Sequence, residues 1–163
     1  MGTPQGAFAV GGVHWKPSAG DVAKTWARVL AELPLFAGVP KRHLRRIASL
    51  GQEARFARGS QIVRAGEPGN GFFLILEGAA SIVRPSGLPS IPIGVGSYFG
   101  EMALIDGGPR SATVVADTDV LCLRLSRAPF QRMLKDEPEV SVALLKEFAR
   151  RIRELQARAE LGS

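Results

Sequence analysis

Cysteine and histidine are scarce in this chain, and their scarcity limits the chemistry it can perform. Cys122 is the only cysteine among 163 residues, so neither an intrachain disulfide nor a cysteine-rich metal site is possible. His14 and His43 are the only histidines, and neither lies among acidic residues at metal-ligand spacing. The sequence therefore predicts no metal site and disfavours a metal-dependent β-barrel enzyme. We expect His43 to be a solvated or capping residue.

Long apolar runs and common enzyme motifs are also missing. No apolar run approaches the ~20 residues of a membrane span, and the first residues do not resemble an export signal. No GxxxxGK[ST], GxGxxG or GxSxG string occurs, and Ser111 has no nearby histidine that could act as its base. We therefore expect a cytoplasmic protein that is not an enzyme, with no catalytic residues.

Composition is that of one globular domain. With 45% hydrophobic and 22% charged residues, the chain has room for a single sizeable core and some excess at its ends. The net charge of +6 suits nucleic acid, an anionic membrane surface, a small anionic ligand or a solvated basic face equally well. Because the arginines fall mostly in helical contexts where long basic side chains face solvent, direct nucleic-acid binding is not favoured.

Two amphipathic helices are predicted after a leader. Residues 1–20 are rich in Gly and lack periodicity, which predicts a flexible or irregular leader. Asp21 is a plausible N-cap for a helix whose apolar residues Val22, Trp26, Val29, Leu30 and Leu33 share one face. In the second helix, which starts after Pro40 and closes at Gly51, the inward residues are Leu44, Ile47, Ala48 and Leu50, and the solvated ones are Lys41, Arg42, Arg45 and Arg46.

Short apolar segments separated by turn residues follow, and they predict a β-sandwich or barrel. The predicted strands are 54–57, 61–64, 71–77, 79–84, 91–95, 111–117 and 120–126, with clear turns at 66–70 and 85–89. Ser126 could cap a helix over 127–135, and Pro138 starts a longer helix that runs to Leu161. Its apolar stripe is Val140, Leu144, Phe148, Ile152 and Leu155, which suits core packing, a partner subunit or a ligand cover.

The stretch FGEMALIDGGPRSATVV, from Phe99 to Val115, interrupts the predicted strands with one short helix. Residues 101–105 have helical propensity, and Asp106, two glycines and Pro109 stop the helix. Unpaired amides at such a helix start attract a phosphate, and the guanidinium of Arg110 offers two parallel donors to it. The carboxylate of Glu101 is instead suited to accept hydrogen bonds from sugar hydroxyls. The stretch predicts a nucleotide site, although a surface ion pair between Glu101 and Arg110 is the simpler alternative.

These residues resemble the phosphate-binding cassette of the cyclic nucleotide-binding domain family, which includes catabolite activator-like regulators, protein kinase A regulatory subunits and cyclic nucleotide-gated channels. The resemblance covers roughly residues 34 to 158. It implies an α+β fold, a jelly-roll-like antiparallel β-roll over about 54–126 inside a domain of 21–161, with flanking N-terminal and C-terminal helices. The family places Glu101 on the ribose 2′-hydroxyl and Arg110 on the cyclic phosphate. The implied ligand-binding residues are Phe99, Gly100, Glu101, Met102, Ala103, Arg110, Ser111, Ala112, Leu155 and Gln156.

The resemblance also implies a mechanism. In relatives the C-terminal lid helices, here about 127–161, close over the base, which brings Leu155 and Gln156 near the purine. Relatives that prefer cGMP commonly have Thr at the position of Ser111, so cAMP is the favoured ligand and no further cofactor is implied. We expect a regulatory module of signal transduction that acts through an effector protein or fused domain, with a homodimer through the last helix as a further expectation.

Two other functions stay open: a basic DNA-associated regulator fragment, and a protein-interaction domain of this fold that has lost its ligand. Only residues 158–163 follow the ligand-facing part of the last helix, too few for a helix-turn-helix domain. We therefore expect either a solitary binding domain or a piece of a larger protein.

Overall fold

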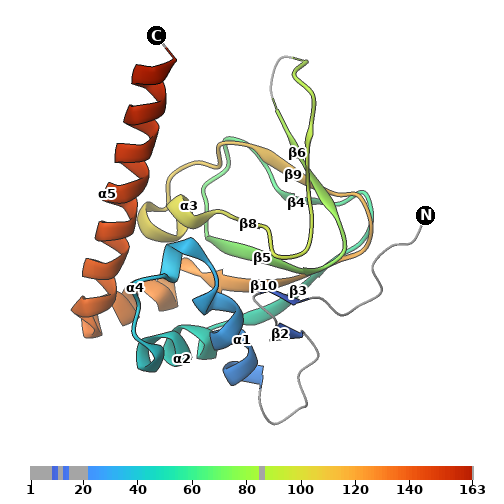
Figure 1. Ribbon diagram of the computed structural model, residues 1–163. Coiled ribbons are helices and arrows are strands. Elements are labelled where there is room, and N and C mark those ends of the chain that lie inside the picture. Colours follow the sequence, from blue (N-terminus) through green and yellow to red (C-terminus); the bar gives the residue numbers. More distant parts are fainter. Residues whose placement is uncertain (1–8, 11–12, 15–21, 85–86, 163) are drawn as a thin grey trace.

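The computed structural model describes residues 9–10, 13–14, 22–84 and 87–162, in which two four-stranded antiparallel sheets pack together and helices cover one side (Figure 1). One sheet has the order β3-β10-β5-β8 and the other β4-β9-β6-β7. This arrangement confirms the predicted β-roll. The strands are β3 (Gln52–Phe56), β4 (Gln61–Val63), β5 (Gly71–Glu77), β6 (Ala80–Val83), β7 (Ile91–Ile93), β8 (Tyr98–Phe99), β9 (Thr113–Ala116) and β10 (Val120–Ser126).

The helices lie before, within and after the roll, as the sequence predicts. They are α1 (Val22–Ala31), the 3-10 turn η1 (Pro34–Phe36), α2 (Lys41–Ser49), α3 (Glu101–Asp106), α4 (Arg127–Asp136) and α5 (Pro138–Leu161). None of the described helices combines the length and the apolar character needed to cross a membrane. Figure 1 shows α5 passing beside α3.

Strands β5 and β10 are apolar on both faces because each face packs on a different core. Phe72, Leu74 and Leu76 of β5 belong to the core under the helices, whereas Phe73 and Ile75 belong to the core between the sheets. β10 divides in the same way, with Leu121, Leu123 and Leu125 under the helices and Val120 and Cys122 between the sheets. Side chains alternate between the faces of a strand, so the unbroken apolar runs that predicted these strands indicate two covered faces.

The two N-terminal helices bury the predicted faces. In α1, Trp26, Val29 and Leu30 are buried, and in α2, Leu44 and Ile47 are buried. The basic residues of α2 at positions 41, 42, 45 and 46 are exposed, as predicted. The predicted cap Asp21 lies outside the described residues. Ser126 does precede α4, but its side chain makes no capping hydrogen bond.

His43 differs from its prediction. Its side chain is buried, with Nδ1 2.7 Å from Oε2 of Glu137 and Nε2 3.0 Å from Oε2 of Glu139. The prediction of a solvated or capping residue was wrong because the acidic partners follow it by more than ninety positions. They lie at the junction of α4 and α5, which packs beside α2.

Several boundaries also differ. β8 was not predicted, because Tyr98 and Phe99 are too short a run to show a period of two. Residues 9–10 and 13–14 of the predicted leader pair as the short antiparallel strands β1 (Ala9–Val10) and β2 (Val13–His14), and the rest of residues 1–20 lies outside the described part. The apolar stripe of α5 divides along its length. Val140 and Leu144 are buried, whereas Ile152 and Leu155 are more than half exposed.

Candidate functional site

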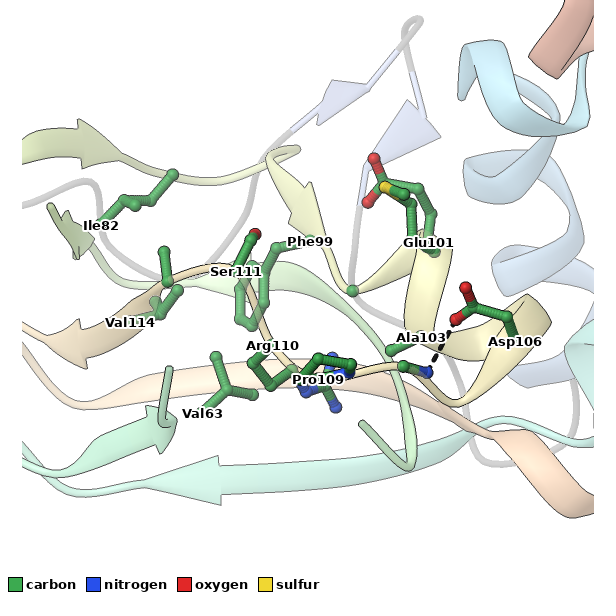
Figure 2. A pocket seen from close by; sticks show the side chains of 14 residues that line it. Val63, Ile82, Phe99, Glu101, Ala103, Asp106, Pro109, Arg110, Ser111 and Val114 are labelled. Atoms are coloured by element: carbon green, nitrogen blue, oxygen red, sulfur yellow. Dashed lines mark hydrogen bonds between the residues drawn. The ribbon is translucent and has the colours of Figure 1, made fainter. Parts of the chain in front are cut away.

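An open cavity of about 350 Å³ lies between α3, the segment before β9 and the second sheet (Figure 2). It is lined by Val63, Ile82, Phe99, Gly100, Glu101, Met102, Ala103, Asp106, Gly108, Pro109, Arg110, Ser111, Ala112 and Val114. Eight of the ten predicted ligand-binding residues are in this lining. Leu155 and Gln156, the other two, are not.

Two glycines set the ends of α3. Gly100 precedes the helix with a φ of +85°, and Gly107 follows it with a φ of +68°, a backbone conformation that strains other residues. The N–H of Gly107 donates to the carbonyl of Ala103 at 2.9 Å. After the helix, Oδ1 of Asp106 accepts a hydrogen bond of 2.7 Å from the N–H of Gly108, drawn as a dashed line in Figure 2. The helix therefore ends sharply and returns the chain to the cavity.

The backbone of Arg110 is held by the loop between β4 and β5. The N–H of Arg110 donates to the carbonyl of Glu67 at 2.9 Å, and the carbonyl of Arg110 accepts from the N–H of Gly66 at 2.9 Å. In the same loop, the N–H of Gly69 donates to the carbonyl of Gly108 at 3.1 Å. This predicted turn thus fixes the position from which the Arg110 side chain leaves the backbone.

The guanidinium of Arg110 carries a buried nitrogen, Nη1, that has no hydrogen-bond partner among the described residues. Its Cζ lies 5.8 Å from the ring centroid of Phe73, and the Cζ of Arg124 lies 5.9 Å from the same centroid. Burial, and then the positive charge of Arg124, lower the pKa of Arg110. The unpaired Nη1 and the nearby positive charge of Arg124 are both unfavourable for a charged Arg110 side chain. A bound anion would accept a hydrogen bond from Nη1 and offset the two positive charges.

Glu101 enters the cavity lining from the first turn of α3, and Figure 2 shows it on a different wall from Arg110. Its Oε1 lies 3.4 Å from Nη1 of Arg151, which is on α5. Nη2 of the same arginine donates to the hydroxyl of Tyr98 at 3.0 Å, and its Nε donates to Oε1 of Glu147 at 3.2 Å. The carboxylate is therefore paired with α5 and not with Arg110. The simpler sequence hypothesis, a surface ion pair between Glu101 and Arg110, has no counterpart among the ion pairs of the described residues.

Leu155 and Gln156 lie on the exposed C-terminal half of α5. Leu155 is 62% exposed. Neither residue lines the cavity, and their contact with a ligand stays a prediction.

The apolar wall of the cavity was not predicted. Val63, Ile82 and Val114 come from β4, β6 and β9, three strands of one sheet. Sequence alternation shows that such residues face one side of a strand, but not which strands are neighbours. The wall adds apolar contact area beside the charged part of the site.

Comparisons with known proteins identify the family. Residues 53–137 match the family model described as "Cyclic nucleotide-binding domain". The chain is 37% identical over 130 residues to a cyclic nucleotide-gated potassium channel of Mesorhizobium japonicum, a match that covers 80% of this chain and 36% of the channel. The chain thus spans about a third of the length of that relative.

Solved structures show the same similarity. The N-terminal domain of a transcriptional regulator from Streptomyces coelicolor superposes with a TM-score of 0.72 at 32% identity, over 80% of this chain and 94% of that one. The regulatory domain of Toxoplasma gondii protein kinase A, solved with cAMP, has a TM-score of 0.63 at 28% identity, over 81% of this chain and 51% of that one. Because the family model covers more than half of the chain and two of these relatives are 37% and 32% identical to it, the chain belongs to the cyclic nucleotide-binding domain family.

Proposed function

We propose that this domain binds cAMP in the cavity beside α3 and passes the binding event to α5. The observation that carries the proposal is the buried, unpartnered Nη1 of Arg110 in a cavity that Glu101 also lines. A cyclic phosphate would supply the missing acceptor and offset the neighbouring charge of Arg124. The cavity volume of about 350 Å³ lies within the range of small-molecule sites.

The remaining groups of the ligand have suitable partners. Oε1 of Glu101 is paired with Arg151, whereas no hydrogen bond to its Oε2 occurs within the described residues, which leaves that oxygen for a ribose hydroxyl. Val63, Ile82 and Val114 offer an apolar wall to the purine. Micromolar binding corresponds to about −8 kcal/mol, a scale that a few charge-assisted hydrogen bonds and purine burial can reach.

The choice of cAMP over cGMP rests on Ser111 and on the relatives. Ser111 lines the cavity where family members that prefer cGMP commonly have Thr. A relative from Mycobacterium tuberculosis is described as a cAMP-activated transcriptional regulator, and the Toxoplasma domain was solved with cAMP.

The route to α5 runs through Arg151. One guanidinium contacts Glu101, Tyr98 and Glu147, so the ligand-binding carboxylate is tied directly to the helix. A ligand that hydrogen-bonds to the Glu101 carboxylate changes the strength of its contact with Arg151. The populations of two α5 positions shift only if the ligand binds the domain with a different affinity in each position. We propose that α5 then acts on an effector protein, a fused domain or a second copy, in the cytoplasm.

Titration of the purified domain with cAMP, cGMP and AMP, by isothermal calorimetry, tests the binding proposal. We expect cAMP to bind tightest and AMP far more weakly, because an open phosphate carries a different charge and shape. Arg110→Ala should lose about 2 kcal/mol or more of cAMP binding energy. Arg64→Ala is the matched control, since Arg64 is exposed and pairs with Glu67 outside the cavity. Equal affinities for AMP and cAMP would contradict the proposal, and absence of any nucleotide binding would favour a protein-interaction domain.

Hydrogen exchange with and without cAMP tests the coupling to α5 separately. Arg151→Gln removes the tie to Glu101 and should raise amide exchange in the second half of α5 without ligand, while shrinking the change that cAMP produces. Arg150→Gln is the control, because Arg150 pairs with Glu147 and Glu154 on its own helix. If cAMP binds the unaltered domain and exchange in α5 does not change, the binding proposal stands and the coupling is wrong.

A further inference from the structure

A second cavity, of about 220 Å³, lies between α1 and α2, at the end of the molecule opposite the β6–β7 hairpin in Figure 1. It is lined by Lys24, Ala27, Arg28, Ala31, Lys41, Leu44 and Arg45. Four of these seven residues are basic, and none is acidic. The basic residues come from two helices, in each of which they are four positions apart and therefore share a face.

Acidic residues at the α4–α5 junction compensate part of the positive charge of helix α2. On the side that faces the α4–α5 junction, Nη2 of Arg42 lies 2.6 Å from Glu139, and Nη1 of Arg46 lies 2.6 Å from Glu137. Nη2 of Arg46 also lies 3.1 Å from Asp136. A short acidic segment, 136–139, thus neutralises one side of the helix.

The side of α2 that faces α1 carries Lys41 and Arg45, which lie next to Arg28 of α1. Within the part of the chain that the structure describes, the side chains of Arg28, Lys41 and Arg45 form no ion pair or hydrogen bond. Like charges around a concave surface add their potentials and attract an anion. The cavity also has an apolar part, which consists of the exposed Ala31 and of the small exposed fractions of Ala27 and Leu44, two residues of the core.

We infer that the α1–α2 cavity is a docking site for an acidic peptide segment of a partner protein. The carboxylates of the partner would meet Arg28, Lys41 and Arg45 as segment 136–139 meets the other side of α2, and an apolar side chain of the partner would contact Ala27, Ala31 and Leu44. A peptide fits better than a membrane surface, because the apolar residues lie within a hollow that a flat layer of headgroups does not enter. The site is separate from the nucleotide cavity, with which it shares no lining residue.

Fluorescence anisotropy with a short labelled peptide, rich in Glu and carrying one Leu, tests the inference on the whole chain. Arg28→Gln/Arg45→Gln should weaken binding about tenfold, and added salt should weaken it further, as expected for exposed charge pairs. Arg55→Gln/Arg58→Gln is the matched control. Both double variants lower the formal charge from +6 to +4, but Arg55 and Arg58 lie in and after β3, away from the cavity. The control should change binding far less than Arg28→Gln/Arg45→Gln does, because salt screens charges that lie away from the cavity.

Further measurements distinguish peptide docking from a net-charge effect and from binding of a membrane or of phosphate. A peptide with Gln in place of every Glu should not bind. Equal losses in the two double variants would overturn the inference, because net charge and not the cavity would then be responsible. So would binding to phosphatidylserine vesicles or inorganic phosphate that depends on Arg28 and Arg45 when the acidic peptide does not bind. Both double variants should unfold at the urea midpoint of the unaltered chain, a result that would show that they fold.

Discussion

The imidazole Nδ1 of His43 on α2 lies 2.7 Å from Oε2 of Glu137, the residue between α4 and α5. Glu139 lies on its other side, with Oε2 3.0 Å from Nε2. Both contacts use a ring nitrogen, so a doubly protonated ring satisfies both carboxylates at once. The arrangement ties the start of α5 to the N-terminal helices.

We expect this cluster to make the stability of the domain depend on pH. Hydrogen bonds with Glu139 and then Glu137 raise the pKa of His43 above 6.5, although burial and, less strongly, the charge of Arg42 oppose the shift. The pKa of Glu137 is lowered, chiefly by Arg46, and that of Glu139 chiefly by His43. The contribution of His43 is therefore complete below 6.5 and is lost as pH rises through its folded pKa. The contribution of the two carboxylates is present above 4.5 and is lost as pH falls through theirs.

Urea midpoints between about pH 5 and pH 9 measure this dependence. The unaltered chain should lose stability as pH rises from about 6.5, and His43→Gln should remove most of that loss. His14→Gln, which replaces the only other histidine, should retain it. A loss of equal size in His43→Gln would refute the assignment to this cluster.

Replacing Arg110 by Met separates stability from binding. In the ligand-free protein the buried Nη1 has no partner within the described residues, so an apolar side chain of similar length should leave the free energy of unfolding unchanged or raise it by up to about 1 kcal/mol. The same change should weaken cAMP binding by about 2 kcal/mol or more, as Arg110→Ala should, because both remove the guanidinium. Thermal unfolding with and without cAMP gives both values. Strong destabilisation without ligand would mean that Arg110 is a structural residue.

Gly100 and Gly59 form a matched pair for testing the approach of the backbone to Arg110. Both have a positive φ, +85° and +87°, so the backbone conformation alone should make Ala cost about 1–2 kcal/mol of stability at either position. A Cβ at Gly100 would also collide with Nη1 of Arg110 and lie 2.6 Å from the carbonyl oxygen of Gly71, whereas nothing lies within 4 Å of a Cβ at Gly59.

The two substitutions should therefore differ in binding. Gly100→Ala should weaken cAMP binding tenfold or more, about 1.4 kcal/mol, because it displaces the guanidinium. Gly59→Ala should leave the affinity unchanged. Calorimetric titration of both variants measures the difference, and equal affinities would show that Gly100 serves only the backbone.

The cassette and the elements that surround it are predictable from the sequence. Gly100, Glu101 and Arg110 are close in the chain, and the helix between them has its own stop residues, so local propensity places them around one turn. The sequence also predicts β5 and β10 from their long apolar runs, and α1 and α2 from their amphipathic faces. These patterns are visible because burial places apolar residues at a spacing that a short stretch of sequence is long enough to show.

Which of these elements contact one another is visible in the folded chain but not in the sequence. Arg151 reaches Glu101 across 50 positions, and His43 reaches Glu137 across 94. The apolar wall of the nucleotide cavity likewise depends on strand neighbours that are not consecutive in the chain. Such pairings follow from how sheets and helices pack as whole bodies, and no local pattern of residues carries that information.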